Sequence, residues 1–298
     1  MTRITLLTGL VLITTMATAQ EFKEKITKEL TFEKKGSNNA LMVANINGHI
    51  NVTGYDGDKI LLEANRTIYA KTDSRLEKAK QEVQLGIIDR ADTLIVYVED
   101  GCNSFGRANS RNRNNWTRKG WGYNWDCGDR NCRKEYDYKM DFTLKVPYGL
   151  HLMVSTINEG NITVENVKGT VDAHNINGSI KLSKLEREAE ASTINGDVDI
   201  EYAVNPTKDC RFYSLNGDIN AYFEKGLAAN MSFESFNGSF YTNIDDLEPL
   251  PVKLVEKAEG EGIKFKVSGN RYQIGNGGDA YLDFETFNGN VYLKEKTN

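Results

Sequence analysis

An apolar residue, Asn, Gly, any residue and a second apolar residue form a string that recurs along the chain. Between residues 160 and 238, successive glycines of this string are 18, 18, 21 and 21 residues apart. One copy has an extra residue and reads Asn158-Glu159-Gly160. Such regular spacing indicates a repeat architecture. The pairs are Asn47-Gly48, Asn177-Gly178, Asn195-Gly196, Asn216-Gly217, Asn237-Gly238 and Asn288-Gly289.

Between the pairs, apolar and polar residues alternate in two short runs per repeat, which is typical of strands with one buried face. A unit of about 20 residues cannot bury such a face alone, so we expect an all-β fold in which the units stack as coils of a β-solenoid. We expect the apolar residues on both sides of a pair, such as Ile176 and Ile180, to share the buried face. The step of 51 residues from Gly238 to Gly289 is long enough for two or three further coils.

The Asn-Gly pairs predict the corners of these coils. Gly, and to a lesser degree Asn, tolerates the positive φ of a tight corner. Asn side chains stacked on successive coils can also hydrogen-bond one another as a ladder. β-Hairpins are the alternative, because Asn-Gly is a strong hairpin signal. Hairpins do not require near-constant spacing, so the repeat favours the solenoid.

The segment before the repeats predicts one helix and further strands. Residues 73–84 place Leu76, Ala79 and Val83 on one helical face, with Asp73 or Ser74 available as the N-cap. Residues 94–98 are apolar and predict a buried strand, and residues 46–52 form one repeat-like coil. We expect the helix to cover an end of the solenoid or to pack on its wall.

The first 19 residues predict an export signal. Arg3 precedes the apolar residues 4–16, and Ala17-Thr18-Ala19 forms a small-residue cleavage site. The apolar run is too short to span a bilayer comfortably, and no other segment predicts a transmembrane helix. We therefore expect one mature domain, residues 20–298, in the periplasm, in the outer cell envelope or secreted.

Composition divides the chain into two unlike parts. It has 30 Asn but only 4 Pro, so Asn-Gly corners replace proline turns. A net charge of −5 argues against a nucleic-acid binder. Residues 101–135 nevertheless hold eight basic and three acidic residues, a charge of +5, which leaves −10 for the rest. An interruption of this length in a repeat domain is either functional or disordered.

The interruption, residues 101–137, predicts a binding region. It contains all three tryptophans of the chain, with basic residues interleaved. Aromatic faces with neighbouring cations can stack on sugar rings and hold an anionic group. Pinning of the insertion against the solenoid by these aromatics is the equally weighted alternative. The candidate binding residues are Trp116, Trp121, Tyr123, Trp125, Arg111, Arg113, Arg118 and Lys119.

Four cysteines in an exported chain predict disulfides. Cys127 and Cys132 would close a small loop and leave Cys102 to pair with Cys210 or to stay free. In the other arrangement, Cys102 pairs within the insertion and Cys210 is simply buried. A zinc site needs four convergent ligands, and the three histidines His49, His151 and His174 are scattered, so we expect neither a metal ion nor a cofactor.

The run from Asp141 to Leu182 resembles the putative-adhesin family of exported bacterial β-strand-repeat proteins. The resemblance rests on Val146-Pro147-Tyr148-Gly149 and Ser155-Thr156-Ile157-Asn158, and it covers roughly residues 40–70 and 138–293. It implies a β-solenoid in the cell envelope and no established chemistry. This chain departs from the family pattern through Glu159 and through the interruption.

These observations predict an exported, non-catalytic scaffold or adhesin-like binding module. Its partner would be an envelope glycan, an anionic envelope polymer or an envelope protein, contacted through residues 101–137. A carbohydrate-active β-helix enzyme is the alternative, with wall carboxylates as its catalytic groups. Its candidate acids are Asp197, Asp199, Glu201 and Asp218. The oligomeric state stays open.

Overall fold

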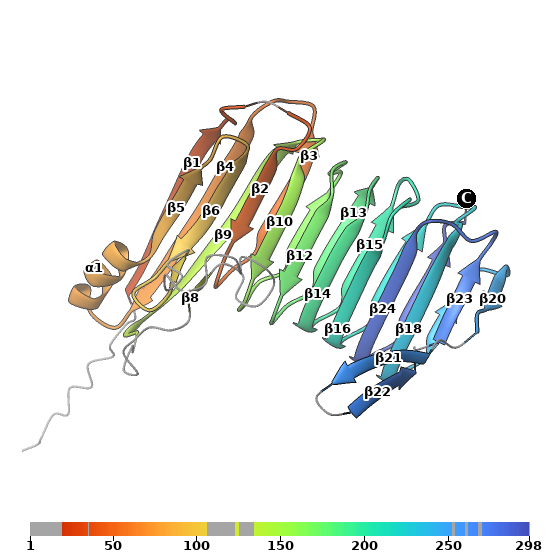
Figure 1. Cartoon of the computed structure of the whole chain (residues 1–298). Coiled ribbons are helices and arrows are strands. Elements are labelled where there is room, and N and C mark those ends of the chain that lie inside the picture. Colours follow the sequence, from red (N-terminus) through yellow and green to blue (C-terminus); the bar gives the residue numbers. More distant parts are fainter. Residues whose placement is uncertain are drawn as a thin grey trace, which may run out of the picture.

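The computed structural model describes residues 20–34, 36–105, 123–124, 134–251, 254–259, 262–267 and 270–297. Within these residues the chain is nearly all β, in two large mixed sheets of 10 and 11 strands, two short ribbons and one helix. Figure 1 shows the strands side by side along an elongated body. The all-β prediction is confirmed for this part of the chain.

The ten-stranded sheet holds one strand of each repeat. Its spatial order is β1 (Gln20–Leu30), β4 (Ile60–Ala70), β9 (Tyr136–Pro147), β3 (Ile50–Tyr55), β11 (Ile162–Glu165), β13 (Ile180–Leu185), β15 (Val198–Tyr202), β17 (Ile219–Phe223), β25 (Val291–Glu295) and β19 (Phe240–Thr242).

The eleven-stranded sheet holds the other strand of each repeat. Its order is β20 (Leu247–Pro249), β23 (Asn270–Ile274), β18 (Ala229–Asn237), β24 (Tyr281–Asn288), β16 (Cys210–Asn216), β14 (Ala189–Asn195), β12 (Val171–Asn175), β10 (His151–Thr156), β2 (Ala40–Ala44), β6 (Thr93–Glu99) and β5 (Gln84–Asp89). The two ribbons are β7 (Ser104–Phe105) with β8 (Tyr123–Asn124), and β21 (Leu254–Glu259) with β22 (Gly262–Val267).

From β10 to β17, successive strands alternate between the two sheets, and each pairs in parallel with the strand one repeat away. The register keeps equivalent residues opposite one another: Ala191 of β14 faces Ala173 on one side and Phe212 on the other. The predicted early coil follows the same rule, because β2 and β3 pair in parallel with β10 and β11. Parallel stacking of the repeats is therefore confirmed.

The core lies between the two sheets and is filled by inward residues of both. Ile180 and Leu182 of β13 are completely buried, as are the small Ala173 and Ala191 of the facing sheet. Towards the later repeats the core becomes aromatic: Phe212 packs on Phe284 with ring centres 5.4 Å apart. Large inward residues therefore occupy the same level in adjacent repeats and stack along the axis of the molecule.

The C-terminal strands are not where the repeat spacing predicts them. β24 lies between β16 and β18, and β25 lies between β17 and β19. Among its described residues, the 51-residue step forms no further coil; it contains β19, β20, the β21–β22 ribbon, β23 and β24. β18 and β19 therefore lie one repeat farther out than their place in the sequence suggests, and the later strands β24 and β25 occupy the positions between them and the preceding repeat. The prediction of two or three further coils was wrong because a spacing does not reveal the spatial order of strands.

The two apolar residues that flank an Asn-Gly pair do not share a face, contrary to the sequence-based expectation. Ile180 is completely buried in the main core, whereas Ile176 packs on a separate outer cluster. Its equivalent Ile194 is 37% exposed. The strand before each pair keeps its alternation up to the Asn, so the apolar residue there points out of the eleven-stranded sheet, and the chain turns only afterwards.

The helix α1 (Asp73–Glu82) begins at the predicted residue and ends two residues before the predicted end, and neither Asp73 nor Ser74 is its cap. Its N-cap is Thr72, whose hydroxyl oxygen accepts a hydrogen bond from the Arg75 N–H at 3.4 Å. Leu76 and Ala79 are buried as predicted, and Val83 just beyond the helix is buried too. The helix contacts β1, β4 and β9 at one end of the ten-stranded sheet (Figure 1).

The predicted strand at residues 94–98 is confirmed as part of β6. Among the described residues, the structure contains no helix that is both long and apolar enough to cross a membrane.

Candidate functional site

The Asn side chains of the corners form the predicted ladder. Asn195 Nδ2 donates to Asn177 Oδ1 at 2.8 Å, and Asn216 Nδ2 donates to Asn195 Oδ1 at 2.9 Å. The ladder starts at Asn158 and continues through Asn288 before it reaches Asn237. Its order therefore follows the spatial order of the strands and not the order of the sequence.

The residue after each corner glycine makes a second ladder. Asp197 Oδ1 accepts the Asp218 N–H at 2.9 Å, and Asp218 Oδ1 accepts the Asn290 N–H at 2.7 Å. Asp199 Oδ1 accepts a bond from Asn220 Nδ2 at 2.8 Å. Glu201 is ion-paired with Lys296 at 3.0 Å. All four candidate catalytic acids thus have structural partners along the stack.

The corner glycines are required by close approach more than by φ. A Cβ on Gly217 would lie 2.1 Å from the carbonyl oxygen of Gly196 in the next repeat. The predicted positive φ applies clearly to Gly48, at 125°, whereas Gly217, at 159°, is close to extended. Successive corners stack so tightly that no side chain fits between them.

A third, buried ladder was missed by sequence reasoning. Two residues before each corner Asn after the first, a Thr, Ser or Asn side chain donates to a corner-glycine carbonyl one repeat away. At the first corner, Asn45 donates to Gly48 O of its own repeat and to Met140 O. Thr193 Oγ1 bonds Gly178 O at 2.9 Å, and Ser214 Oγ bonds Gly196 O at 2.8 Å. The signal was present, because every pair in the repeat is preceded by Thr, Ser or Asn at this position.

The outer face of the eleven-stranded sheet carries the apolar residues that precede each corner Asn. We call this row the apolar stripe; it comprises Ile46, Ile157, Ile176, Ile194, Leu215, Phe287 and Phe236. Its exposure is lowest at Ile46, at 2%, and highest at Phe236, at 75%, with Leu215 half-buried between the exposed Ile194 and Phe287. At the exposed end, the rings of Phe236 and Phe287 stack in parallel with centres 4.8 Å apart. This end of the row is a candidate interaction surface.

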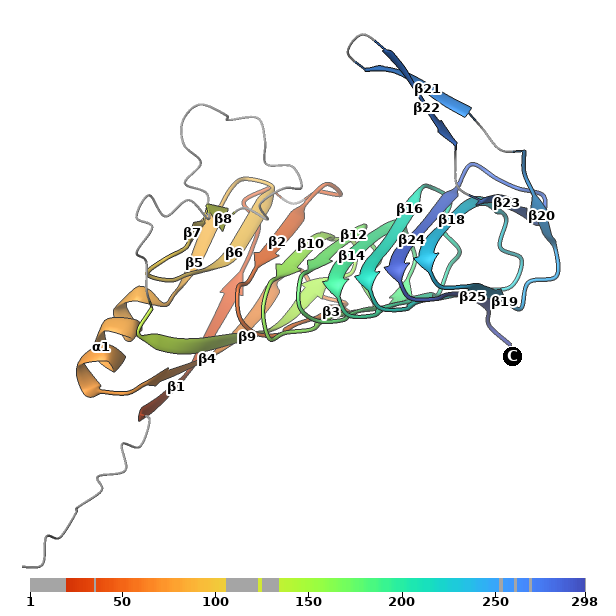
Figure 2. The same ribbon diagram turned by 90° about the horizontal axis from the view of Figure 1, so that it is seen from below.

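The other end of the apolar stripe is covered by the root of the insertion. Phe105, in β7, is buried with Ile46, Ile95 and Ile157, and its ring stacks on Tyr97 with centres 4.6 Å apart. Figure 2 shows the β7–β8 ribbon on the outer side of the eleven-stranded sheet, and the β21–β22 ribbon projecting on this side at the opposite end. The β7–β8 ribbon and the apolar stripe therefore belong to one face of the molecule.

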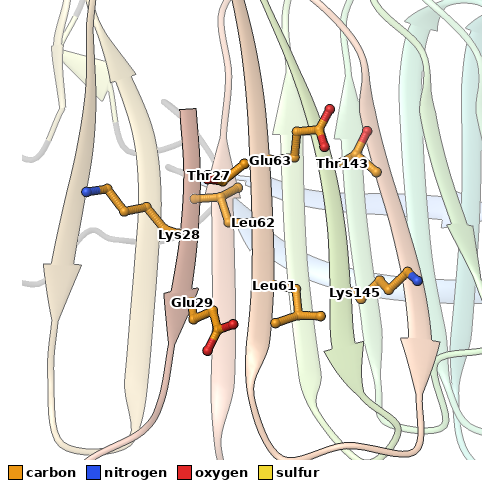
Figure 3. Close-up of a pocket in the computed structure, with 8 residues that line it drawn as sticks. All are labelled: Thr27, Lys28, Glu29, Leu61, Leu62, Glu63, Thr143 and Lys145. Carbon is orange, nitrogen blue, oxygen red and sulfur yellow. The ribbon is translucent and has the colours of Figure 1, made fainter. Parts of the chain in front are cut away.

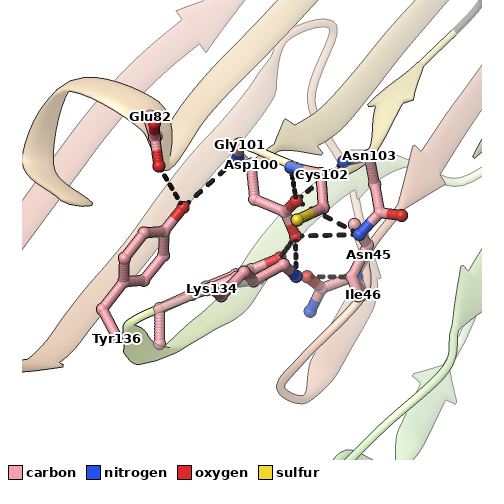
Figure 4. Close-up of polar contacts among 10 residues, drawn as sticks. Asn45, Ile46, Glu82, Asp100, Gly101, Cys102, Asn103, Lys134 and Tyr136 are labelled. Atoms are coloured by element: carbon pink, nitrogen blue, oxygen red, sulfur yellow. Dashed lines mark hydrogen bonds and ion pairs between the residues drawn. The ribbon is translucent and has the colours of Figure 1, made fainter. Parts of the chain in front are cut away.

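The two ends of the insertion are held together by Asp100. Its fully buried carboxylate accepts hydrogen bonds from the backbone N–H groups of Cys102 and Asn103, both at 2.8 Å, and from the Tyr138 hydroxyl at 2.7 Å. Lys134, near the C-terminal end of the insertion, forms an ion pair with Asp100 at 2.5 Å (Figure 4). The insertion thus leaves and re-enters the fold at a fixed point.

Electrostatics favour the charged form of Asp100. Burial alone would raise its pKa, but the hydrogen bonds from Lys134 and Tyr138 outweigh this effect and lower the pKa below its ordinary value. Beside it, the Tyr136 hydroxyl donates to Glu82 at 2.8 Å and accepts the Gly101 N–H at 3.2 Å (Figure 4). Burial raises the pKa of Tyr136, which stays a neutral donor.

A band of polar residues runs beside the apolar stripe on the same face. Register places Asp172, Glu190, Arg211 and Asp283 in one row and His174, Ser192, Tyr213 and Glu285 in the next. Arg211 contacts both Asp283, at 3.6 Å, and Glu285, at 3.2 Å. A shallow hollow of about 450 Å³ lies over the first row. The face therefore combines an apolar edge with a charged centre.

A second hollow of about 400 Å³ lies on the ten-stranded sheet, between β1, β4 and β9 (Figure 3). It is lined by Thr27, Glu29, Glu63 and Lys145, among others. Its acids have ion-pair partners: Glu29 contacts Lys59 and Glu63 contacts Lys25, both at 2.8 Å. Because these carboxylates are already ion-paired, the hollow is a weaker candidate for a binding site than the outer face of the eleven-stranded sheet.

Most of the predicted binding residues lie outside the described residues. This holds for the export signal, for Cys127 and Cys132, and for Trp116, Trp121, Trp125, Arg111, Arg113, Arg118 and Lys119. Tyr123 lies in β8, opposite Phe105. The upper end predicted for the interruption, residue 137, falls inside β9, which begins at Tyr136.

Cys210 is buried and free, so it forms no disulfide with Cys102. Its thiol lies 3.2 Å from the Tyr202 hydroxyl, and burial raises its pKa. Pairing of Cys102 within the insertion stays a prediction.

Solved structures similar to this chain include two bacterial proteins. One is described as a putative cell adhesion protein from Clostridium sporogenes, with 12% identity, a TM-score of 0.42, and coverage of 92% of this chain and 100% of that chain. The other is described as a putative adhesin from Bacteroides fragilis, with 13% identity, a TM-score of 0.38, and coverage of 92% and 97%. No protein-family model and no curated protein matches the chain.

Proposed function

We propose that this protein is an exported, non-catalytic, adhesin-like binding module of the cell envelope. Its scaffold would be a β-solenoid, whose coils are the strand pairs stacked in parallel by the three corner ladders. The contact surface would be the outer face of the eleven-stranded sheet together with the insertion rooted on it. The exposed end of the apolar stripe is the observation that carries this proposal.

The arrangement of the apolar stripe supports a binding role. Phe236 and Phe287 are 75% and 44% exposed, although their rings stack on each other and present a flat surface. The stability of the fold does not require an exposed aromatic pair, so its presence favours a binding role. Flat aromatic surfaces suit sugar rings or apolar side chains of a partner. The neighbouring charged row supplies hydrogen-bonding groups that orient such a partner.

Two features support placing the insertion in the same contact surface. Phe105 covers the first part of the apolar stripe, and the Asp100–Lys134 pair fixes the point from which the insertion leaves the fold. The basic and aromatic composition of residues 106–133 suits an anionic envelope glycan or polymer.

The contacts of the candidate catalytic acids favour a structural role for them over a catalytic one. Asp197 and Asp218 accept backbone hydrogen bonds from the next repeat, and Glu201 is paired with Lys296. A catalytic acid or base must be free to exchange a proton with its substrate. We expect no release of reducing sugar ends from envelope polysaccharides incubated with the protein.

A binding screen tests the proposal. The mature chain is compared with a variant in which a short Gly-Ser linker replaces residues 106–133, on immobilised peptidoglycan, lipopolysaccharide and teichoic acid. We expect binding to at least one polymer and weaker binding by the variant. The proposal fails if the mature chain binds none of them and recovers no envelope protein, or if the variant keeps every partner unchanged.

A further inference from the structure

Three side chains with metal-binding chemistry converge on the outer face of the eleven-stranded sheet. Asp172 and His174 are two residues apart on β12 and therefore point to the same side. Glu190 of β14 lies directly opposite Asp172 in the parallel register. One ligand atom of each of the three residues lies within 4.8 Å of the others, and all three are half-buried. The cluster could not be predicted from the sequence, because residues 172 and 190 are a full repeat apart.

The imidazole of His174 is held in a fixed orientation. Its Nδ1 lies 2.5 Å from Oγ of Ser192, which is the residue opposite His174 on β14. The other ring nitrogen, Nε2, faces Asp172 Oδ1 at 2.5 Å. A histidine that ligates a metal commonly has its second nitrogen bonded to a polar group, which fixes the tautomer and aims the ligating nitrogen. Ser192 is placed to do this.

Asp172 supplies the second observation. Its Oδ1 is inaccessible to solvent, yet no donor reaches it with acceptable hydrogen-bond geometry, despite its closeness to Nε2. A carboxylate oxygen withdrawn from water without a donor is costly. A cation held between Nε2, Asp172 and Glu190 would satisfy this oxygen. The competing explanation is an imidazole, neutral or charged, that carries a proton on Nε2 and pairs with Asp172.

We propose that His174, Asp172 and Glu190 bind a divalent transition-metal ion of the zinc class. One imidazole nitrogen and two carboxylate oxygens form a donor set that suits Zn²⁺. Tetrahedral ligand bonds of about 2.0–2.2 Å place the ligand atoms about 3.3 Å apart. His174 Nε2 and Asp172 Oδ1, now 2.5 Å apart, would therefore move apart by about 0.8 Å to admit the ion, within the 4.8 Å that the three ligand atoms span. Three protein ligands leave at least one coordination position open to water or to a group of a partner. This inference replaces the sequence-based expectation of no metal site.

Calorimetric titration of tag-free residues 20–298 with ZnCl₂ tests the proposal. We expect one ion per chain, and at least about tenfold weaker binding for His174→Gln. Ser192→Ala should weaken binding by about tenfold, because it removes only the group that orients the ring. Co²⁺ bound at the same site gives visible absorption bands that report the nitrogen ligand, and His174→Gln should change them.

His151→Gln is the matched control. This histidine lies on the same face of β10, and its Nδ1 is 2.7 Å from Thr170 Oγ1, so it resembles His174 without belonging to the cluster. We expect His151→Gln to bind Zn²⁺ as the wild type does. Circular dichroism of each metal-free variant confirms that it is folded.

Two results would overturn the metal site. One is the absence of Zn²⁺ binding up to about 1 mM, which would leave the pairing of a protonated Nε2 with Asp172 as the explanation. The other is binding that His174→Gln leaves unchanged, which would place the ion elsewhere in the chain. Neither result affects the proposed binding role of the apolar stripe, because none of the three ligands belongs to it.

Discussion

Gly217→Ala tests whether close stacking of the corners holds the repeats together. The new Cβ would lie 2.1 Å from Gly196 O, whereas ordinary contact begins at 3.4 Å. The two corners would have to separate by about 1.3 Å, the difference between these distances. Four hydrogen bonds join them, from Asn216 to Asn195, from Asp218 to Asp197, from Ser214 to Gly196 O and from Gly196 N to Asn216 O. Their lengths of 2.8–3.0 Å leave no room for such a separation.

The expected loss of stability follows from these bonds. At about 1 kcal/mol each, four bonds contribute about 4 kcal/mol. The reduced freedom of the unfolded chain returns about 1 kcal/mol when Ala replaces Gly. Gly217→Ala should therefore lower the free energy of unfolding by about 3 kcal/mol, measured by urea titration and far-ultraviolet circular dichroism.

Gly149→Ala is the control, because a Cβ there meets no atom within 4 Å. It should change the free energy of unfolding by less than about 1 kcal/mol. Hydrogen exchange should also be faster at the corners around residues 195–219 of the Gly217→Ala variant. The reasoning is refuted if Gly217→Ala costs no more than Gly149→Ala, or if exchange at these corners is unchanged.

Three further predictions concern buried polar groups. Asp100→Asn should cost about 3 kcal/mol at pH 7, because Lys134 loses its partner. The pKa of Asp100 is lowered in the fold, so its contribution is complete above the ordinary value of 3.8 and is lost as the pH falls through the lower folded value. The difference between variant and wild type in urea titrations should accordingly shrink towards pH 3, and a difference independent of pH would contradict this. Thr193→Val removes the bond to Gly178 O and should cost about 1 kcal/mol in the same titration; a stabilised variant would show that the buried ladder is dispensable. Burial raises the pKa of the Cys210 thiol, so iodoacetamide at pH 8 should alkylate it about 100-fold more slowly in the native protein than in urea, as peptide mass spectrometry would show. Equal rates would contradict its burial.

The repeated corners could be predicted because their geometry recurs in the sequence. Stacking places the same residue types at the same level of each repeat, so a ladder between Asn177 and Asn195 appears as a spacing of 18. The spatial order of the last repeats could not be predicted this way. β24 lies between β16 and β18 although it follows β18 in the sequence. The local sequence pattern of each repeat would be the same in either spatial order.

The candidate site depends on which side of a strand each residue faces. The expectation that Ile176 shares the core with Ile180 places the whole apolar stripe in the core, and this expectation is wrong. Alternation along β14 settles the matter, because Ala189, Ala191 and Thr193 point inwards and Ile194 therefore points outwards. Applied to the other repeats, the same alternation predicts from the sequence alone that Phe236 and Phe287 point outwards.

The metal cluster and the Asp100 clamp lay beyond sequence reasoning for a different reason. Both join residues far apart in the chain: Asp172 meets Glu190 across two strands, and Asp100 meets Lys134 across the insertion. Single acids and bases of this kind carry no local pattern, because any exposed strand position accepts them.

Paired aromatic substitutions test the proposed contact surface most directly. Phe236→Ser with Phe287→Ser removes the exposed stack of the apolar stripe, and Tyr241→Ser with Tyr292→Ser removes a similar stack on the ten-stranded sheet, with ring centres 5.0 Å apart. Affinity of both double variants for the polymer or protein retained in the binding screen would be measured by surface plasmon resonance. The account predicts at least about tenfold weaker binding for the phenylalanine variant and a change below about twofold for the tyrosine variant. Equal affinity of the phenylalanine variant and the wild type would contradict it.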